Sequence, residues 1–100
     1  MQATAKGNRV EERRFARIDV DLSSLNLRLP AHFGVTDNVS RHGARILTSA
    51  PWKANERLTL RSLKGSFRSR GRVIYCEPHG EIYAVGLQLY AIAGDWISPA

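Results

Sequence analysis

Hydrophobic residues alternate with polar ones along most of the chain, at the period of two residues that half-buried β-strands produce. The first such run begins at Ile18 and continues through three alternating leucines to Pro30, which ends the strand. A second run covers 33–40, and one of its positions, Asp37, is out of step with the alternation. The hydrophobic positions of the second run that share one face, and that we expect to be buried, are Phe33, Val35 and Val39.

Four further runs bring the number of predicted strands to six: 44–49, 57–61, 67–77 and 81–90. The run 67–77 is the longest of the six, and Gly71 inside it indicates a bulge or sharp coiling. Its two faces differ in chemistry, since Phe67, Val73 and Tyr75 share one face and Arg68, Arg70 and Arg72 share the other.

Short strands with frequent turns and no helical period predict an all-β fold, a small six-stranded antiparallel β-barrel. Closure into a barrel would remove exposed sheet edges. Residues 1–10 carry no periodicity and are expected to be a flexible N-terminal tail. The folded domain is predicted over 11–96, with a flexible arm at its start, and 97–100 is a short C-terminal end.

The chain has 100 residues and a formal net charge of +6, which favours an anionic partner without identifying it. Its one cysteine, Cys76, forms no disulfide within the chain and fits a reducing compartment. No apolar run approaches the roughly 18 residues of a spanning helix, and the N-terminus resembles no signal peptide. We therefore expect a cytoplasmic protein without membrane insertion, a monomer or a weak dimer.

Two short motifs stand out because they supply complementary chemistry. The first is Arg13-Arg14-Phe15-Ala16-Arg17, an R-x-x-x-R pattern on the predicted arm. The second is Asn38-Val39-Ser40-Arg41-His42-Gly43, a (D/N)-x-S-x-x-G pattern. Guanidinium groups grip phosphate oxygens in bidentate fashion and also stack on bases. Together the motifs predict a binding site for a cyclic dinucleotide.

Strand geometry refines the second motif. Side chains alternate faces along a strand, so Asn38 and Ser40 are expected to point outward together while Val39 points into the core. An amide and a hydroxyl there offer the donors and acceptors that a guanine edge requires. Gly43 would allow a positive φ or a close approach of the backbone.

These residues resemble the PilZ domain, a bacterial receptor family for the second messenger cyclic di-GMP. The resemblance spans about 11–96 and includes the stretches 55–60, 71–75 and 83–89. It implies a six-stranded barrel that has no enzymatic activity, no metal and no cofactor besides the ligand itself. Carried over by motif position, the cyclic di-GMP site comprises Arg13, Arg14, Arg17, Asn38, Ser40 and Gly43.

Two features depart from the family pattern. Glu12 stands where many relatives carry a further arginine that accompanies capture of a stacked ligand dimer, so the acid implies a single bound molecule. Many relatives also continue into a C-terminal helix, whereas here the chain ends soon after Trp96, which could cap the barrel or be left for a partner. With no fused output module, the resemblance implies that an unidentified effector protein reads the ordering of the arm.

Other functions fit the sequence less well. Ser40 and His42 lack an acid placed to orient the histidine, and Cys76 with His79 forms a single C-x-x-H pair, so a nucleophile and a zinc site are both disfavoured. A basic barrel for single-stranded nucleic acid is also disfavoured, because no aromatic residue lies between the arginines of 68–72. An adaptor that does not bind the nucleotide remains an alternative.

Overall fold

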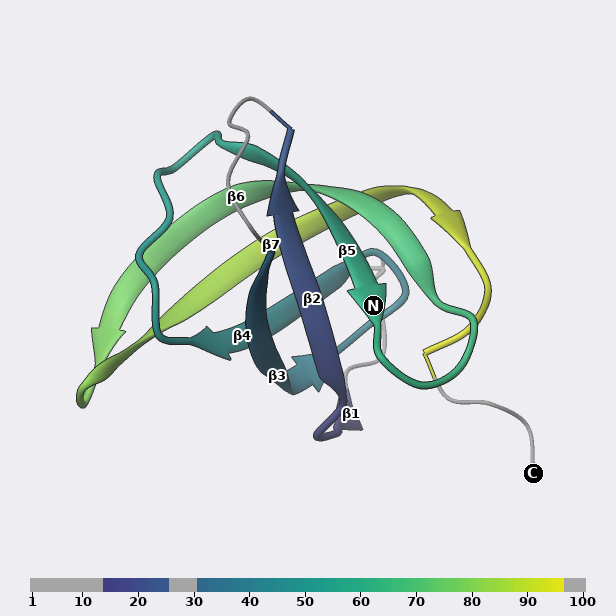
Figure 1. Ribbon diagram of the computed structural model, residues 1–100, viewed down its shortest axis with the longest axis horizontal. Coiled ribbons are helices and arrows are strands. Elements are labelled where there is room, and N and C mark those ends of the chain that lie inside the picture. The colour runs from purple at the N-terminus through teal and green to yellow at the C-terminus, as the bar shows by residue number, and fades with distance from the viewer. Residues whose placement is uncertain (1–13, 26–30, 97–100) are drawn as a thin grey trace, which may run out of the picture.

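The computed structural model describes residues 14–25 and 31–96, which form seven β-strands and no α-helix (Figure 1). The alternation of apolar and polar residues explains why these segments are strands with one buried face. The strands are β1 (Arg14–Phe15), β2 (Asp19–Ser24), β3 (His32–Val39), β4 (Gly43–Thr48), β5 (Arg57–Ser62), β6 (Arg68–His79) and β7 (Ile82–Ala93).

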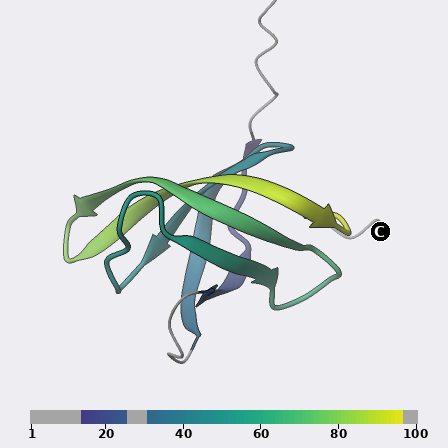
Figure 2. The ribbon, with the colours of Figure 1, turned by 90° about the horizontal axis from the view of Figure 1, so that it is seen from above.

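Six of the strands close into an antiparallel barrel, as the sequence predicts. The sheet runs in the order β1-β3-β2-β5-β6-β7-β4, and a further pairing of β3 with β4 closes it. The long pair β6 and β7 arches across the molecule, β5 runs alongside β6, and β2 lies in front of them in the view of Figure 1 (Figures 1 and 2). β1 lies outside the closed ring and pairs only with β3 among the described strands.

The core fills the barrel with side chains from all six ring strands. Val39, Ile46, Leu58, Val73 and Val85 are fully buried, and each comes from a different strand. On β2 the buried hydrophobic side chains are Val20 and Leu22, which lie in the first part of the predicted first run. Residues 26–30, which include Leu27 and Leu29, lie outside the described residues.

Because of a bulge in β3, the side chains that face the core differ from those predicted. The pairing register with β4 shifts between Thr36 and Asn38, which is where Asp37 breaks the alternation. Val39 is buried as predicted, but Phe33 is 69% exposed and Val35 only half-buried, so the prediction that all three share the core face is wrong. Thr36 occupies the buried phase instead and is fully buried.

A second bulge has the same effect in β6. The register with β7 shifts between Val73 and Tyr75. Phe67 and Val73 are buried as predicted, whereas Tyr75 is 39% exposed and does not join them in the core. Its ring instead covers Gly86, its partner on β7.

Trp96 closes the hydrophobic core near the C-terminal end of the described chain. Its ring stacks on Phe67, with centroids 3.9 Å apart and an interplanar angle of 12°. The indole Nε1–H donates to the backbone carbonyl of Ser40 at 3.3 Å. Of the two roles predicted for Trp96, the structure shows packing onto the barrel, which also ties this residue to the second motif.

Candidate functional site

The arm and the second motif are neighbours in the structure because β1 pairs with the end of β3. Arg14 is the antiparallel partner of Val39, and Phe15 is the partner of Asn38. Figure 1 shows β1 beside β3 at one end of the barrel. The two motifs, separated by the 20 residues 18–37, are therefore joined by backbone hydrogen bonds on one wall.

The residues on both sides of Arg17 are hydrogen-bonded to one buried side chain, that of Thr36. The Thr36 hydroxyl donates to the carbonyl of Ala16 and accepts from the N–H of Ile18 at 2.8 Å. The N–H of Thr36 also donates to the carbonyl of Ile18 at 3.0 Å. Because both neighbours of Arg17 are fixed while Arg17 itself is exposed, its guanidinium projects from a rigid base. Sequence reasoning missed Thr36, since its role depends on the bulge.

Asn38 and Ser40 do not form the outward pair that the sequence predicts. Asn38 is half-buried, whereas Ser40 is only 8% exposed. Ser40 follows the last residue of β3, and its N–H donates to the carbonyl of Gly43 at 2.9 Å. Ser40 thus shapes the β3–β4 turn, and its hydroxyl is not displayed on the outer wall.

Gly43 serves the site through close packing. Of the two roles predicted for it, the structure shows the close approach, because Gly43 is not among the residues with positive φ. A Cβ at this position would lie 3.2 Å from Oγ of Ser40 and 3.4 Å from the carbonyl oxygen of Leu87. A side chain at position 43 would therefore crowd both the turn and β7.

Arg45 adds a guanidinium to this wall that the sequence analysis did not single out. It is the partner of Asn38 across β3 and β4. Its Nη1 lies 2.9 Å from a carboxylate oxygen of Asp37, and its Nη2 lies 3.5 Å from one of Glu77. The strand period on β4 was the available signal, since Arg45 shares the outward phase of Gly43.

A pocket of about 370 Å³ opens beside the turn of the second motif. Arg41 and His42, the two residues between Ser40 and Gly43, line it together with Ile92 and Trp96. Its other lining residues are Phe67, Gly94 and Asp95. The volume is at the lower end of the range of roughly 300–1,000 Å³ found for small-molecule sites. The pocket combines an arginine and an imidazole with an aromatic floor.

The structure thus brings Arg14, Arg17, Asn38, Ser40 and Gly43 to one end of one wall. Arg13 and Glu12 lie outside the described residues. In the described part of the chain, no group of three or more His, Cys, Asp or Glu side chains is arranged to hold a metal ion. Nor does that part contain a helix long and apolar enough to cross a membrane.

Comparison with protein families gives a match to the PilZ domain over residues 9–95. The matched segment includes both motifs and all seven strands. A search of curated proteins gives no significant match.

Proposed function

The chain belongs to the PilZ domain family, and on that premise we propose that it is a receptor for cyclic di-GMP that signals to a partner protein. The observation that carries the proposal is the pairing of Arg14 with Val39, since it brings Arg14 beside the second motif. A doubly charged ligand bound on this wall meets guanidinium groups from the arm and from β4.

The arginines of the arm differ in how firmly their backbone is attached to the barrel. Arg17 stands between two residues bonded to Thr36, so it acts as a fixed phosphate contact that needs no reorganisation. Arg14 belongs to a two-residue strand outside the barrel ring, and so short a pairing opens at little cost. Arg14, with Arg13 before it, closes over the bound dinucleotide, and these contacts exist only in the bound state.

Phe15 supports a role for the arm in signalling. It is 90% exposed, although it lies on a strand beside the site. Exposed aromatic residues anchor many protein interfaces. When the arm closes on the ligand, Phe15 is repositioned with it, and a partner protein reads this change. Binding of the nucleotide and presentation of Phe15 are then coupled through one short segment.

Isothermal titration with cyclic di-GMP tests the proposal. The unchanged protein should bind, and a double Arg13→Ala, Arg17→Ala variant should lose most of its affinity. Charge-assisted hydrogen bonds contribute about 1.5–3 kcal/mol each, so Arg17→Ala alone should weaken binding by roughly ten- to a hundredfold.

Arg70→Ala is the matched control, because it removes one exposed arginine from the opposite side of the barrel. It should leave the dinucleotide affinity unchanged. Absence of binding heat with the unchanged protein would contradict the receptor function and favour an adaptor that does not bind the nucleotide. Equal losses for Arg17→Ala and Arg70→Ala would contradict the assigned site.

A further inference from the structure

The outer face of β5 and β6 carries five arginines in register. Arg57 is the cross-strand partner of Arg72, and Arg61 is the partner of Arg68. Arg70 lies between them on β6, opposite Thr59. Four of the five are exposed and Arg72 is half-buried, so we refer to Arg57, Arg61, Arg68, Arg70 and Arg72 as the arginine face.

When no anion is bound, the arginine face lowers the stability of the fold, because like charges directly opposite each other on neighbouring strands repel. Only part of the charge is compensated. Arg61 forms an ion pair with Asp21 at 2.6 Å, and Arg72 donates to the neutral oxygens of Asn55 and Gln88. Arg68 and Arg70 have no hydrogen-bond or ionic partner among the described residues. An external anion would complete the arrangement.

An aromatic ring lies on the same face. Tyr90 of β7 is the cross-strand partner of Arg70. Its hydroxyl accepts a hydrogen bond from Nη1 of Arg57 at 3.0 Å, and the Arg57 guanidinium carbon lies 5.8 Å from the ring centroid. Within β6 no aromatic residue separates the arginines. The register shows that β7 supplies one.

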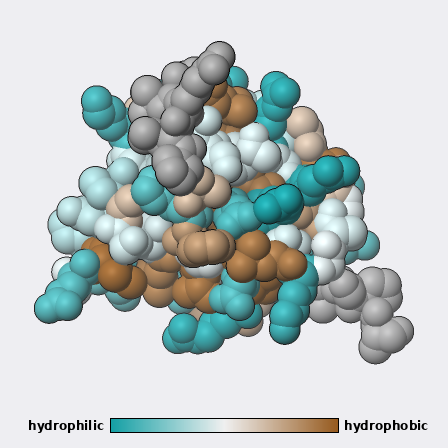
Figure 3. Space-filling view, viewed as in Figure 1, coloured by the Kyte–Doolittle hydropathy of each residue, from teal (hydrophilic) through white to brown (hydrophobic). Residues whose placement is uncertain are grey.

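The arginine face is separate from the candidate dinucleotide site. In the closed ring β3-β2-β5-β6-β7-β4, β6 is three strands away from β3 in either direction. The two surfaces therefore lie on opposite sides of the barrel, and a ligand on one leaves the other accessible. The space-filling view shows one side of the molecule, on which hydrophobic residues gather below the centre and hydrophilic residues project around them (Figure 3).

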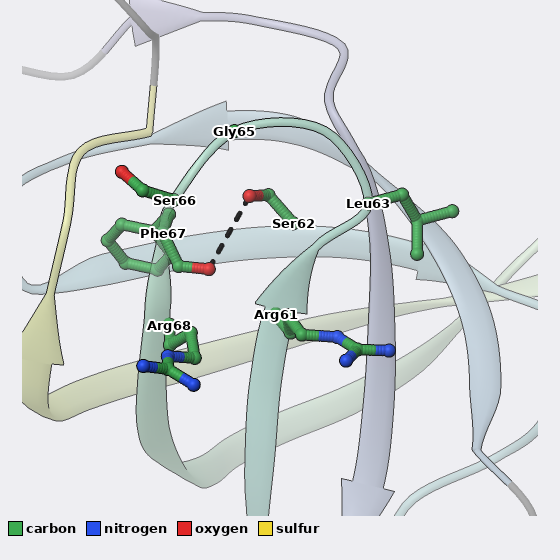
Figure 4. A pocket seen from close by; sticks show the side chains of 7 residues that line it. All are labelled: Arg61, Ser62, Leu63, Gly65, Ser66, Phe67 and Arg68. Atoms are coloured by element: carbon green, nitrogen blue, oxygen red, sulfur yellow. Dashed lines mark hydrogen bonds between the residues drawn. The ribbon is translucent and has the colours of Figure 1, made fainter.

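At one end of the arginine face, the hairpin between β5 and β6 forms a pocket of about 470 Å³. Arg61 and Arg68 line it from neighbouring strands, and Gly65 and Ser66 close it at the tip (Figure 4). The Arg61 side chain turns toward β2, where Asp21 lies. The Arg68 side chain does not turn toward β2 (Figure 4). Arg68 is thus available to a phosphate at the mouth of this pocket.

We propose that the arginine face binds single-stranded nucleic acid. Arg68, Arg70 and Arg72 follow one another at alternate positions of one strand, about 7 Å apart, and form a linear cationic track for a phosphate backbone. Tyr90 offers a ring on which a base stacks. Of the exposed large hydrophobic residues among those described, Leu63 lines the hairpin pocket and Ile74 follows Arg72 by two residues on β6, but none lies between the arginines, whereas protein interfaces need buried apolar anchors. Protein–nucleic acid interfaces are polar and strongly positive, as this face is.

The test is fluorescence anisotropy with a fluorescein-labelled oligothymidylate, titrated over a range of salt concentrations. The unchanged protein should bind with a steep salt dependence. A double Arg68→Gln, Arg70→Gln variant should bind about tenfold more weakly or worse, and its salt slope should fall by about 1.4, since single strands lose roughly 0.7 per phosphate contact. Tyr90→Leu should weaken oligothymidylate binding by about tenfold without changing the salt slope.

A double Arg14→Gln, Arg17→Gln variant is the matched control, because it removes the same charge from the opposite wall. It should retain oligothymidylate binding, and the Arg68→Gln, Arg70→Gln protein should retain cyclic di-GMP binding in parallel titrations. Thermal melts of both variants establish that they are folded. An equal loss of oligothymidylate binding in the two double variants would overturn the proposal, since it would show diffuse attraction to net charge.

Two further probes separate the nucleic acid from other polyanions. Phosphatidylserine vesicles and polyglutamate should bind more weakly than oligothymidylate at the same salt concentration. If either binds as tightly, and loses affinity equally in the Arg68→Gln, Arg70→Gln variant, the face recognises a membrane or an acidic protein and the proposal is wrong.

Discussion

Thr36 and Ile18 hold each other by two hydrogen bonds. The backbone N–H of Ile18 donates to the Thr36 hydroxyl at 2.8 Å, and the N–H of Thr36 donates to the Ile18 carbonyl at 3.0 Å. The same hydroxyl donates to Ala16, and Thr36 is fully buried. A single buried side chain thus connects the barrel wall to the segment that presents Arg17.

Thr36→Val should weaken both the fold and the candidate site. Valine has nearly the same shape but leaves the Ile18 N–H and the Ala16 carbonyl without this partner, at a cost of about 1–3 kcal/mol in unfolding free energy. Arg17 would then project from a loosened base, and cyclic di-GMP affinity should fall several-fold. Urea denaturation and isothermal titration measure the two effects.

Thr48→Val provides the matched control for this variant. Thr48 is also buried in the sheet, and its hydroxyl donates to the carbonyl of Phe33 at 2.9 Å, away from the arm. It should lose a comparable amount of stability while keeping its dinucleotide affinity. Equal losses of affinity in the two variants would show that Thr36 acts only through general stability.

Trp96→Ala should destabilise the barrel strongly. The indole stacks on Phe67 within the hydrophobic core, and truncation of a buried tryptophan to alanine typically costs about 3–5 kcal/mol. Trp96→Phe keeps a ring against Phe67 but loses the hydrogen bond to Ser40, so it should cost about 1 kcal/mol. Calorimetric melts of both variants measure these differences, and a Trp96→Ala protein that melts with the unchanged one would contradict the packing.

Asp37→Asn should free Arg45 for the ligand. The ion pair is partly solvated, with side-chain exposures of 26% for Arg45 and 30% for Asp37, so its loss should change the unfolding free energy by less than about 1 kcal/mol. The released guanidinium raises the positive potential of the wall, and cyclic di-GMP should bind more tightly. Glu77→Gln is the control, because its contact with Arg45 is longer, at 3.5 Å, and it should have a smaller effect on the titrated affinity.

The six strands of the barrel ring follow from the sequence because alternation is a local signal, whereas the sequence does not predict the additional two-residue strand β1. The sequence does not predict which side chains of β3 face the core, since this depends on how β3 packs against β4. A Cβ at Gly34 would lie 2.7 Å from Cγ2 of Ile46, so the glycine occupies the crowded inner position and Phe33 faces outward. The sequence marks Asp37 as out of step, but only the register shows that Thr36 consequently enters the core.

The sequence likewise predicts those features of the candidate site that are local, and not those that depend on contacts between distant residues. Both motifs are visible in the sequence, and the strand pairing joins them, Arg14 to Val39 and Phe15 to Asn38. The outward position predicted for Ser40 fails, because the turn to Gly43 and the bond from Trp96 enclose it. Trp96 is 56 residues away in the chain, and no local pattern predicts such a contact.

Gly86→Ala should destabilise the protein through Tyr75. The bulge in β6 sets the Tyr75 ring over Gly86, and a Cβ at position 86 would overlap that ring. Overpacking of this kind typically costs about 1–3 kcal/mol in unfolding free energy. In a Tyr75→Ala background the three atoms nearest to the added Cβ, all from the Tyr75 ring, are gone, so the cost of the substitution should largely disappear. A double-mutant cycle measured by urea denaturation isolates this coupling. Additive effects of Gly86→Ala and Tyr75→Ala would contradict the ring-over-glycine contact, and with it the register that β6 and β7 adopt beyond the bulge.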